Sequence, residues 1–312
     1  MTQLDHLART AAVAIAVALL PVVVPCQGSP APSTSTVTRS NMLVTTTWLA
    51  EHLRDPSLVI LHVGRPAQYD AGHIPGARRV SLGDIATAPG PEKLTLEMPT
   101  AEQFTTWAQA QGIGDRSRVV IVAHDDTLQT ATRVFVTLAY FGAMERVSLL
   151  DGGFKAWSAE GRETSVNLPA TPPSVRFTAR VQPGLLATLE QVEAATLDRR
   201  TSIIDARLPR FFDGNGGGFP RPGHIPTAVN IPLNTVSVGS GHLRAPAELR
   251  KLFVDAGVSD GKPVVTYCHI GQQASLLWFV ATMLGYEARM FDGSFQQWSG
   301  TERLPVVLPP DK

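Results

Sequence analysis

Two motifs occur twice in the sequence, and this repetition limits the possible folds more than any other feature. Gly-His-Ile-Pro-x-Ala spans Gly72–Ala77 and again Gly223–Ala228, and Asp-Gly-x-Phe-x-x-Trp spans Asp151–Trp157 and again Asp292–Trp298. The period of roughly 140 residues is far longer than the period of about 20 to 50 residues that solenoid repeats have. The chain is therefore predicted to contain two copies of one domain.

Both halves have the same order of expected elements. In the first half, a short helix around Leu49 precedes a buried apolar strand at Leu58–Leu61. In the second half, a helix that begins with the capping box Thr188–Gln191 precedes a strand at Ile203–Ile204. Strands that alternate with helices form a parallel sheet flanked by helices. The predicted fold class is α/β, with ligand chemistry at the carboxyl ends of the strands.

The length and composition agree with two globular domains. The chain has 312 residues, of which 44% are hydrophobic and 17% charged. We predict an N-terminal domain at residues 42–162 and a C-terminal domain at residues 184–305. Residues 163–183 contain many Pro, Thr and Ser residues and are predicted to be the linker.

Cys268 stands where a predicted strand ends and a predicted helix begins. The run Pro263–Tyr267 is apolar and β-branched, and an apolar helical pattern extends from Leu276 to Leu284. Loop amides and the helix dipole at such a place favour a thiolate, and they can lower a cysteine pKa from about 8.5 to roughly 3.5 to 7.5. The alternative is a cysteine that packs as a small hydrophobic residue. The position at a strand-to-helix loop favours the reactive thiol.

Alignment of the two halves separates their roles. Asp125 falls opposite Cys268, and the first half has no equivalent of the triplet Asp205–Arg207. We therefore predict that the C-terminal half is catalytic and that the N-terminal half is inactive.

Taken together, these residues resemble the tandem-domain rhodanese family, the thiosulfate and 3-mercaptopyruvate sulfurtransferases. The likeness covers nearly everything after about residue 42, and its motifs form a specific set. The resemblance implies two tandem rhodanese-like domains, with Asp125 at the cysteine position of the inactive one. It also implies that Cys268 takes a sulfane sulfur from thiosulfate or a related donor such as 3-mercaptopyruvate, holds it as a persulfide, and passes it to cyanide or a thiol.

The resemblance further implies that the loop after the nucleophile binds the donor. The loop residues concerned are His269, Ile270, Gly271, Gln272 and Gln273. Family members resemble Cys-Arg-Lys-Gly-Val-Thr or Cys-Gly-Ser-Gly-Val-Thr here, and this loop matches neither, so the choice of donor stays open. Because the loop has no fixed cation, backbone amides, His269 where it is protonated, and neighbouring arginines are expected to meet the charge of the donor.

Arg207 and Arg210 are the predicted substrate-binding arginines. A planar guanidinium suits an oxyanion. The family places a substrate-binding arginine four residues after the one in Asp-Ala-Arg, and that position is Phe211 here, with Arg210 one residue before it. Arg221 is a third candidate. Asp205 is expected to support the loop structurally.

Other enzyme classes fit less well. A phosphatase on this fold would need an arginine where Ala274 stands, and a disulfide enzyme would need a resolving cysteine near Cys268. His73 and His224 lie in the motif that both halves share, so they are assigned to packing. The eight histidines have no metal-ligand spacing, and no metal or cofactor is expected. A non-catalytic sulfur-carrier or binding module stays open as the alternative function.

The N-terminus predicts export. An apolar run at Ala11–Leu20 follows Arg9, so residues 1–26 read as a signal peptide or lipoprotein signal, and residues 27–41 as a Ser/Pro/Thr-rich tether. The expected location is periplasmic or extracellular. The chain is released after cleavage, anchored to the membrane through a lipid on Cys26, or held there by the apolar segment retained as an N-terminal anchor. The 27 basic and 27 acidic residues balance, so no nucleic-acid partner is expected. The expected partners are a small anionic sulfur donor and a thiol or protein acceptor.

Overall fold

The computed structural model describes most of the chain after residue 40. The described residues are 41–88, 94–125, 128–239, 241–259 and 261–308. The predicted signal peptide, and all of the predicted tether except its last residue, lie outside them. Within the described ranges, no helix has both the length and the apolar character that crossing a membrane requires.

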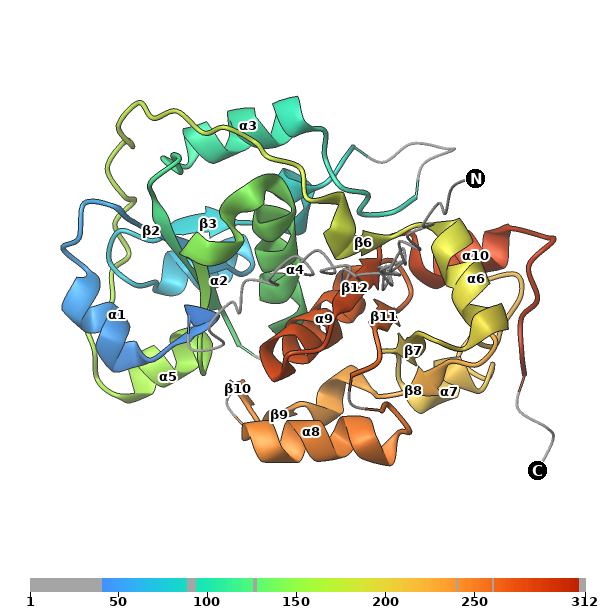
Figure 1. Ribbon diagram of the computed structural model, residues 1–312. Helices are drawn as coiled ribbons and strands as arrows, with labels where there is room; N and C mark the ends of the chain where they lie inside the picture. The colour runs from blue at the N-terminus through green and yellow to red at the C-terminus, as the bar shows by residue number, and fades with distance from the viewer. Residues whose placement is uncertain (1–40, 89–93, 126–127, 240, 260, 309–312) are drawn as a thin grey trace, which may run out of the picture. The chain divides into compact units, whose positions relative to one another are not determined.

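The N-terminal half alternates strands and helices as expected (Figure 1). Its strands are β1 (Leu43–Val44), β2 (Leu58–Val63), β3 (Arg78–Val80), β4 (Arg118–Ala123) and β5 (Val147–Leu150). Its helices are α1 (Thr46–His52), α2 (Pro66–Ala71), α3 (Ala101–Ala110), α4 (Leu128–Leu138) and α5 (Gly153–Ala159). Short helical turns connect them at η2 (Leu82–Ile85), η3 (Ala139–Ala143) and η4 (Met144–Arg146).

The C-terminal half repeats this order and adds a small hairpin. Its strands are β6 (Leu186–Ala187), β7 (Ser202–Asp205), β8 (Val229–Asn230), β9 (Ser237–Val238), β10 (His242–Leu243), β11 (Val264–Tyr267) and β12 (Ala288–Phe291). Its helices are α6 (Leu189–Asp198), α7 (Pro209–Phe212), α8 (Pro246–Asp255), α9 (Gln272–Leu284) and α10 (Ser294–Gly300), with the turns η5 (Pro183–Leu185) and η6 (Leu233–Thr235). The hairpin is the antiparallel pair β9 and β10.

Each half forms a five-stranded parallel sheet with the same strand arrangement. The order is β1-β5-β4-β2-β3 in the first sheet and β6-β12-β11-β7-β8 in the second. The central strands β4 and β11 are apolar runs that are buried on both faces, as parallel strands between helix layers must be. The expected capping box also forms, because the side chain of Thr188 accepts a hydrogen bond from the amide of Gln191. The predicted α/β fold of two repeated domains is confirmed.

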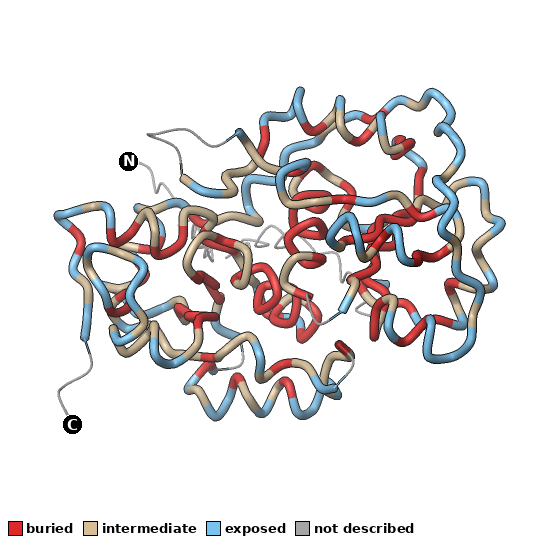
Figure 2. Tube along the Cα trace, turned by 180° about the vertical axis from the view of Figure 1, so that it is seen from behind, coloured by how far each residue is buried: buried red, intermediate tan, exposed pale blue. Residues whose placement is uncertain are grey.

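Helices α4 and α9 lie side by side and join the two halves (Figure 1). Phe135 on α4 packs edge to face against Phe279 on α9, with 4.9 Å between ring centroids. Buried residues of both halves form one continuous apolar cluster, which is the red region at the centre of Figure 2. A smaller core covers the other face of each sheet. Each sheet therefore has one face that packs only within its own domain and one face that packs in the core shared by both domains.

The segment predicted as the linker runs along the N-terminal domain without helix or strand. The amide of Asp115 donates to the carbonyl of Arg176, and the amide of Gln182 donates to the carbonyl of Tyr140. Phe177 is buried in the shared core. This connection is therefore held along its length and does not act as a free tether.

The histidines of the repeated motif are packing residues, as predicted. His73 is fully buried and stacks on Tyr69 with 3.8 Å between ring centroids. His224 stacks in the same way on Phe212, at 3.7 Å. In each half the histidine also forms an isolated β-bridge to a later segment, at Ser165 or Val307.

His62 is a buried histidine at the end of β2 that carries no predicted role. Its side chain is fully buried, its Nε2 lies 3.0 Å from Nδ1 of His124, and its Nδ1 has no hydrogen-bond partner. Burial, followed by the nearby rings of His124 and His73, lowers the pKa of His62 to about 3. The ring is therefore neutral in the folded protein at any pH above about 4.

This pKa predicts a loss of stability in mild acid. The unfolded chain binds the proton near pH 6.5 and the folded chain only near pH 3, so the contribution is complete above pH 6.5 and is lost as the pH falls. Between pH 7 and pH 5 the loss should be about 2 kcal/mol. Urea unfolding of the wild type at both pH values should show this loss in the free energy of unfolding. The loss should be smaller in His62→Gln, because glutamine does not titrate. An equal loss in both proteins would contradict this assignment.

Candidate active site

The loop that holds Cys268 is bent by a glycine that the packing requires. Gly271 has a φ of +83° and precedes the first residue of α9. A Cβ atom at this position would lie 2.7 Å from the carbonyl oxygen of Asp292. Only glycine accepts both this backbone conformation and this close approach. The turn therefore brings the start of α9 back over the end of β11.

Four backbone amides of the loop donate hydrogen bonds to the sulfur of Cys268. The donors are Ala274, Ile270, Gln273 and Gly271, in decreasing order of their effect on the pKa. This is the amide cradle that the strand–loop–helix pattern predicts. Such a cradle stabilises negative charge on sulfur.

The expected low pKa of Cys268 is not found. The thiol is fully buried, and this burial raises its pKa above the ordinary value, while the four amides oppose the rise. Desolvation of the thiolate is larger than the stabilisation by the amides because no water reaches the sulfur. At neutral pH the resting group is therefore a thiol, and the few thiolates present have high intrinsic nucleophilicity.

The segment after β12 fixes the backbone of the loop. The amide of Cys268 donates to the hydroxyl oxygen of Ser294 at 3.2 Å, and the amide of Phe295 donates back to the carbonyl of Cys268 at 2.9 Å. Ser294 has a positive φ and is fully buried. The sequence analysis missed it, although the repeat offered a signal: the first copy of the motif has Gly153 at this place.

His269 is neutral and lies among aromatic rings. Burial, followed by the charge of Arg207, lowers the pKa of His269, so the ring is uncharged at pH 7. The condition under which His269 was expected to meet the charge of the donor, its protonation, is therefore not fulfilled at pH 7. Phe211 contacts the ring edge to face at 4.5 Å, and Phe219 stacks at 6.0 Å. The ring packs as an apolar group beside the nucleophile.

The other predicted loop residues lie around the cradle. Ile270 is partly exposed and contributes its amide. The side chain of Gln273 lies 3.3 Å from Nδ1 of His269. Gln272 points to the other domain, where its Nε2 donates to the hydroxyl of Thr130 at 2.9 Å. That side chain is an inter-domain contact.

Arg207 does not face solvent, contrary to its predicted role in substrate binding. It is 2% exposed, and its Nε and Nη2 bind both carboxylate oxygens of Asp205 at 2.6 to 3.0 Å. Nη2 also donates to the carbonyl of Gly223, and the guanidinium lies 4.1 Å from the ring centroid of Phe295. The arginine braces the loop, because a fork that is bound to Asp205 is not free to bind an oxyanion. The structural role predicted for Asp205 agrees with this geometry.

The remaining two arginines differ in exposure. Arg210 is exposed on α7, with its guanidinium over the ring of Phe211, and its role in substrate binding stays a prediction. Arg221 is not available for substrate, because its guanidinium donates to carbonyl groups of the last turn of α10 and of the residues that follow it. The acceptors are the carbonyl oxygens of Trp298, Ser299, Thr301, Glu302 and Leu304.

The corresponding loop of the N-terminal domain has no thiol. It follows β4 and carries Asp125, which has a φ of +55° and accepts a hydrogen bond from the side chain of Gln68. A cavity of about 490 Å³ lies at this end of the sheet, and Asp125, Arg65 and Arg79 are among its lining residues. The structure agrees with an N-terminal domain that keeps the pocket without the nucleophile.

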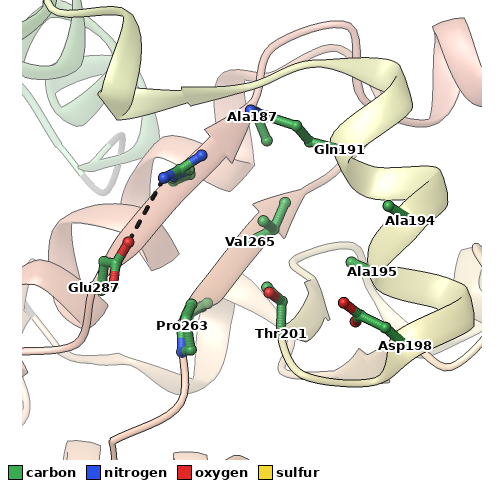
Figure 3. Close-up of a pocket in the computed structure, with 11 residues that line it drawn as sticks. Ala187, Gln191, Ala194, Ala195, Asp198, Thr201, Pro263, Val265 and Glu287 are labelled. Atoms are coloured by element: carbon green, nitrogen blue, oxygen red, sulfur yellow. Dashed lines mark ion pairs between the residues drawn. The ribbon is translucent and has the colours of Figure 1, made fainter.

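A second hollow of the C-terminal domain lies away from Cys268. It has a volume of about 250 Å³ and is lined by residues of α6 and by the first residues of β11 and β12, where Glu287 pairs with Arg289 (Figure 3). Pro263, at its edge, precedes Cys268 by five residues, which is about 16 Å along an extended strand. A molecule bound there would lie at the wrong end of the sheet to meet the thiol.

The described part of the chain contains no cluster of three or more His, Cys, Asp and Glu side chains that could hold a metal ion. The functional groups that the structure places at the candidate site are the Cys268 thiol, the loop amides and the buried Asp205–Arg207 pair.

Comparison with known proteins agrees with this geometry. The family model described as "Rhodanese-like domain" matches residues 45–160 and again residues 188–301, which is more than half of the chain. The chain belongs to the rhodanese family. The expectation drawn from the repeated motifs is confirmed, and both copies of the domain are present.

Relatives of similar length carry both functional descriptions considered above. "Putative thiosulfate sulfurtransferase SseA" of Mycobacterium bovis is 32% identical over 91% of this chain and 96% of its own. "Sulfur carrier protein TtuD" of Thermus thermophilus is 29% identical over 85% of this chain and 96% of its own. The structure of SseA from Escherichia coli, titled as a 3-mercaptopyruvate sulfotransferase, has a TM-score of 0.73 and 28% identity, and covers 81% of this chain and 98% of that one.

In this rhodanese, the raised pKa of Cys268 predicts reactivity that increases at alkaline pH. In a Cys26→Ser protein, where Cys268 is the single thiol, the rate of alkylation by iodoacetamide should increase with pH and reach half its maximum above about pH 8.5. Alkylation followed by mass spectrometry between pH 6 and pH 10 measures it. A midpoint below pH 7 would mean that the amides outweigh desolvation.

The buried Asp205–Arg207 pair predicts a large effect on stability. Asp205→Asn leaves the guanidinium of Arg207 buried without its counter-charge, which should lower the free energy of unfolding by about 3 to 5 kcal/mol. The matched control is Asp255→Asn, which removes the exposed pair with Lys251 on α8 and should cost about 1 kcal/mol or less. Urea unfolding of both variants measures the difference. Equal costs would show that Asp205 does not brace the loop.

Proposed function

We propose that this rhodanese is a sulfurtransferase that moves a sulfane sulfur from thiosulfate, or a related donor such as 3-mercaptopyruvate, to cyanide or a thiol. The observation that carries the proposal is the set of four loop amides that converge on the sulfur of Cys268, at the carboxyl end of the central strand. The names of the similar proteins support it.

The reaction takes two displacements. Once the residues that bury Cys268 have moved aside, its thiol loses its proton to solvent, and the thiolate attacks the outer sulfur of thiosulfate. The S–S bond of thiosulfate breaks, its electron pair leaves on sulfite, and a Cys268 persulfide remains. Cyanide or a thiolate then attacks the outer sulfur of the persulfide, and the Cys268 thiolate returns as the leaving group.

The amide cradle stabilises the charge that this chemistry moves. The amides of Ile270 and Gly271 already donate to Cys268 sulfur, so they need no reorganisation when the sulfur becomes anionic. Because Cys268 is fully buried, the donor must displace part of the cover before it reaches the sulfur. The aromatic residues Phe211 and Phe219 contact His269, the residue next to Cys268 in the chain.

A sulfur-carrier function is the second candidate. A buried thiol with a raised pKa suits slow loading and protection of a persulfide, and one similar protein bears the name of a sulfur carrier. A carrier would accept sulfur once at Cys268 and release it only to a specific partner protein. Turnover with cyanide separates the two functions.

We also propose that the protein is exported, with either release or lipid attachment at Cys26. The apolar run Ala11–Leu20 supports this proposal. A mass measurement of the purified mature chain gives its first residue and any lipid on Cys26, and a mature chain that retains residues 1–26 without a lipid would contradict it.

The proposed function predicts that one cysteine accounts for all transfer. Cys268→Ser should reduce the rate of thiocyanate formation from thiosulfate and cyanide to background, and Asp125→Ala, in the inactive domain, should leave it within about twofold. After thiosulfate alone, the wild type should gain about 32 Da, the mass of one sulfur, at Cys268. Loading without turnover would favour the carrier, and equal loss in both variants would overturn the assignment to one active domain.

A further inference from the structure

Arg133 is a fully buried charged residue of the domain that lacks the nucleophile. It lies on α4, within the interface with α9. A guanidinium in such a place is stable only when other groups satisfy its charge and its donors. The groups that contact Arg133 therefore indicate the role of its side chain.

The guanidinium of Arg133 joins the two domains through Asp292. Its Nη1 donates to Oδ1 of Asp292 at 2.5 Å, and its Nη2 donates to the carbonyl oxygen of Leu96. The other carboxylate oxygen of Asp292 accepts from the amide of Met98 at 3.1 Å. Asp292 belongs to the turn whose Ser294 accepts the hydrogen bond from the amide of Cys268.

The same guanidinium lies against the loop of the nucleophile. A Cβ atom on Gly271 would come within 2.9 Å of Nη1 of Arg133, so the two groups are in direct contact. Gly271 supplies one of the four amides that donate to the sulfur of Cys268. The Cys268 loop therefore packs against Arg133 and Asp292 at the glycine where it bends.

Packing alone does not account for an arginine at this position. Thr132 faces Ser275 across the interface, so the residue of α9 that corresponds to Arg133 is Leu276, which is also buried. An apolar side chain thus suits the equivalent place in the other helix. In addition, Nε of Arg133 is buried without a hydrogen-bond partner, a cost that leucine or methionine would avoid.

We propose that Arg133 is a positioning residue, through which the N-terminal domain holds the Cys268 loop in the conformation that aims its amides at the sulfur. This rests on the proposed role of Cys268. It also gives the domain without a nucleophile a part in the reaction, as the source of the cation that fixes Asp292 and Gly271.

The test compares Arg133→Met and Arg133→Lys with a control at the same interface, all as full chains with Cys26→Ser. The control is Thr132→Ala, which removes the uncharged hydrogen bond to Ser275 Oγ. One readout is the pH profile of Cys268 alkylation by iodoacetamide, which does not depend on sulfur transfer. The other is kcat/KM for thiosulfate with cyanide.

In Arg133→Met the loop amides should no longer point at the sulfur of Cys268. The midpoint of the alkylation pH profile should therefore move upward by about one pH unit, and kcat/KM should fall about tenfold or more. Arg133→Lys should lie between Arg133→Met and the wild type, and Thr132→Ala should have the alkylation profile of the wild type. If Arg133→Met does not fold, the upward shift of the alkylation midpoint in Arg133→Lys tests the proposal instead.

An alkylation profile that is unchanged in the arginine variants, or moved equally by Thr132→Ala, would overturn the proposal. If the arginine variants show the shift but the wild type transfers no sulfur, the proposed function is refuted and the positioning role still stands. The Asp205–Arg207 pair and His269 also lie at this loop, and they are unchanged in all of these proteins.

Discussion

The contact between α4 and α9 is the interaction on which the rest of the structure depends. The hydroxyl groups of Thr132 and Ser275, at equivalent places in the two domains, lie 2.9 Å apart. The two helices thus meet around an approximate twofold relation. The two motif aspartates follow the same twofold relation. Asp151 accepts a hydrogen bond from the amide of Leu243 in the second domain, and Asp292 accepts one from the amide of Met98 in the first. Duplication gave a single core that neither half completes alone.

The chemistry at Cys268 results from two opposing effects of that core. The same folding that aims four amides at the sulfur also removes the sulfur from water, and here desolvation is the larger effect. A thiol that is neutral at rest is less exposed to oxidation, since the thiolate is the reactive form. The enzyme then depends on donor binding, and on movement of the residues that bury Cys268, to expose the sulfur to its substrates.

The sequence predicted what repeats and local patterns determine, namely the domain pair, the α/β class and the loop at Cys268. It could not predict properties that arise only when distant segments meet. Arg207 stands two residues after Asp205, and spacing alone does not tell whether its fork turns inward or toward a substrate. The pKa of Cys268 depends on how completely other segments cover it. Arg133 gave no signal, because its equivalent in the second half is an ordinary apolar residue.

The contacts of Arg221 link the loop between α7 and β8 to the end of the described chain. Its guanidinium caps the carboxyl end of α10, and the neighbouring residue His224 pairs with Val307. The loop between α7 and β8, which includes Phe219 beside His269, is therefore held in place by the final described segment of the chain. Proteolytic removal of that segment would release the loop beside His269 while leaving both sheets whole.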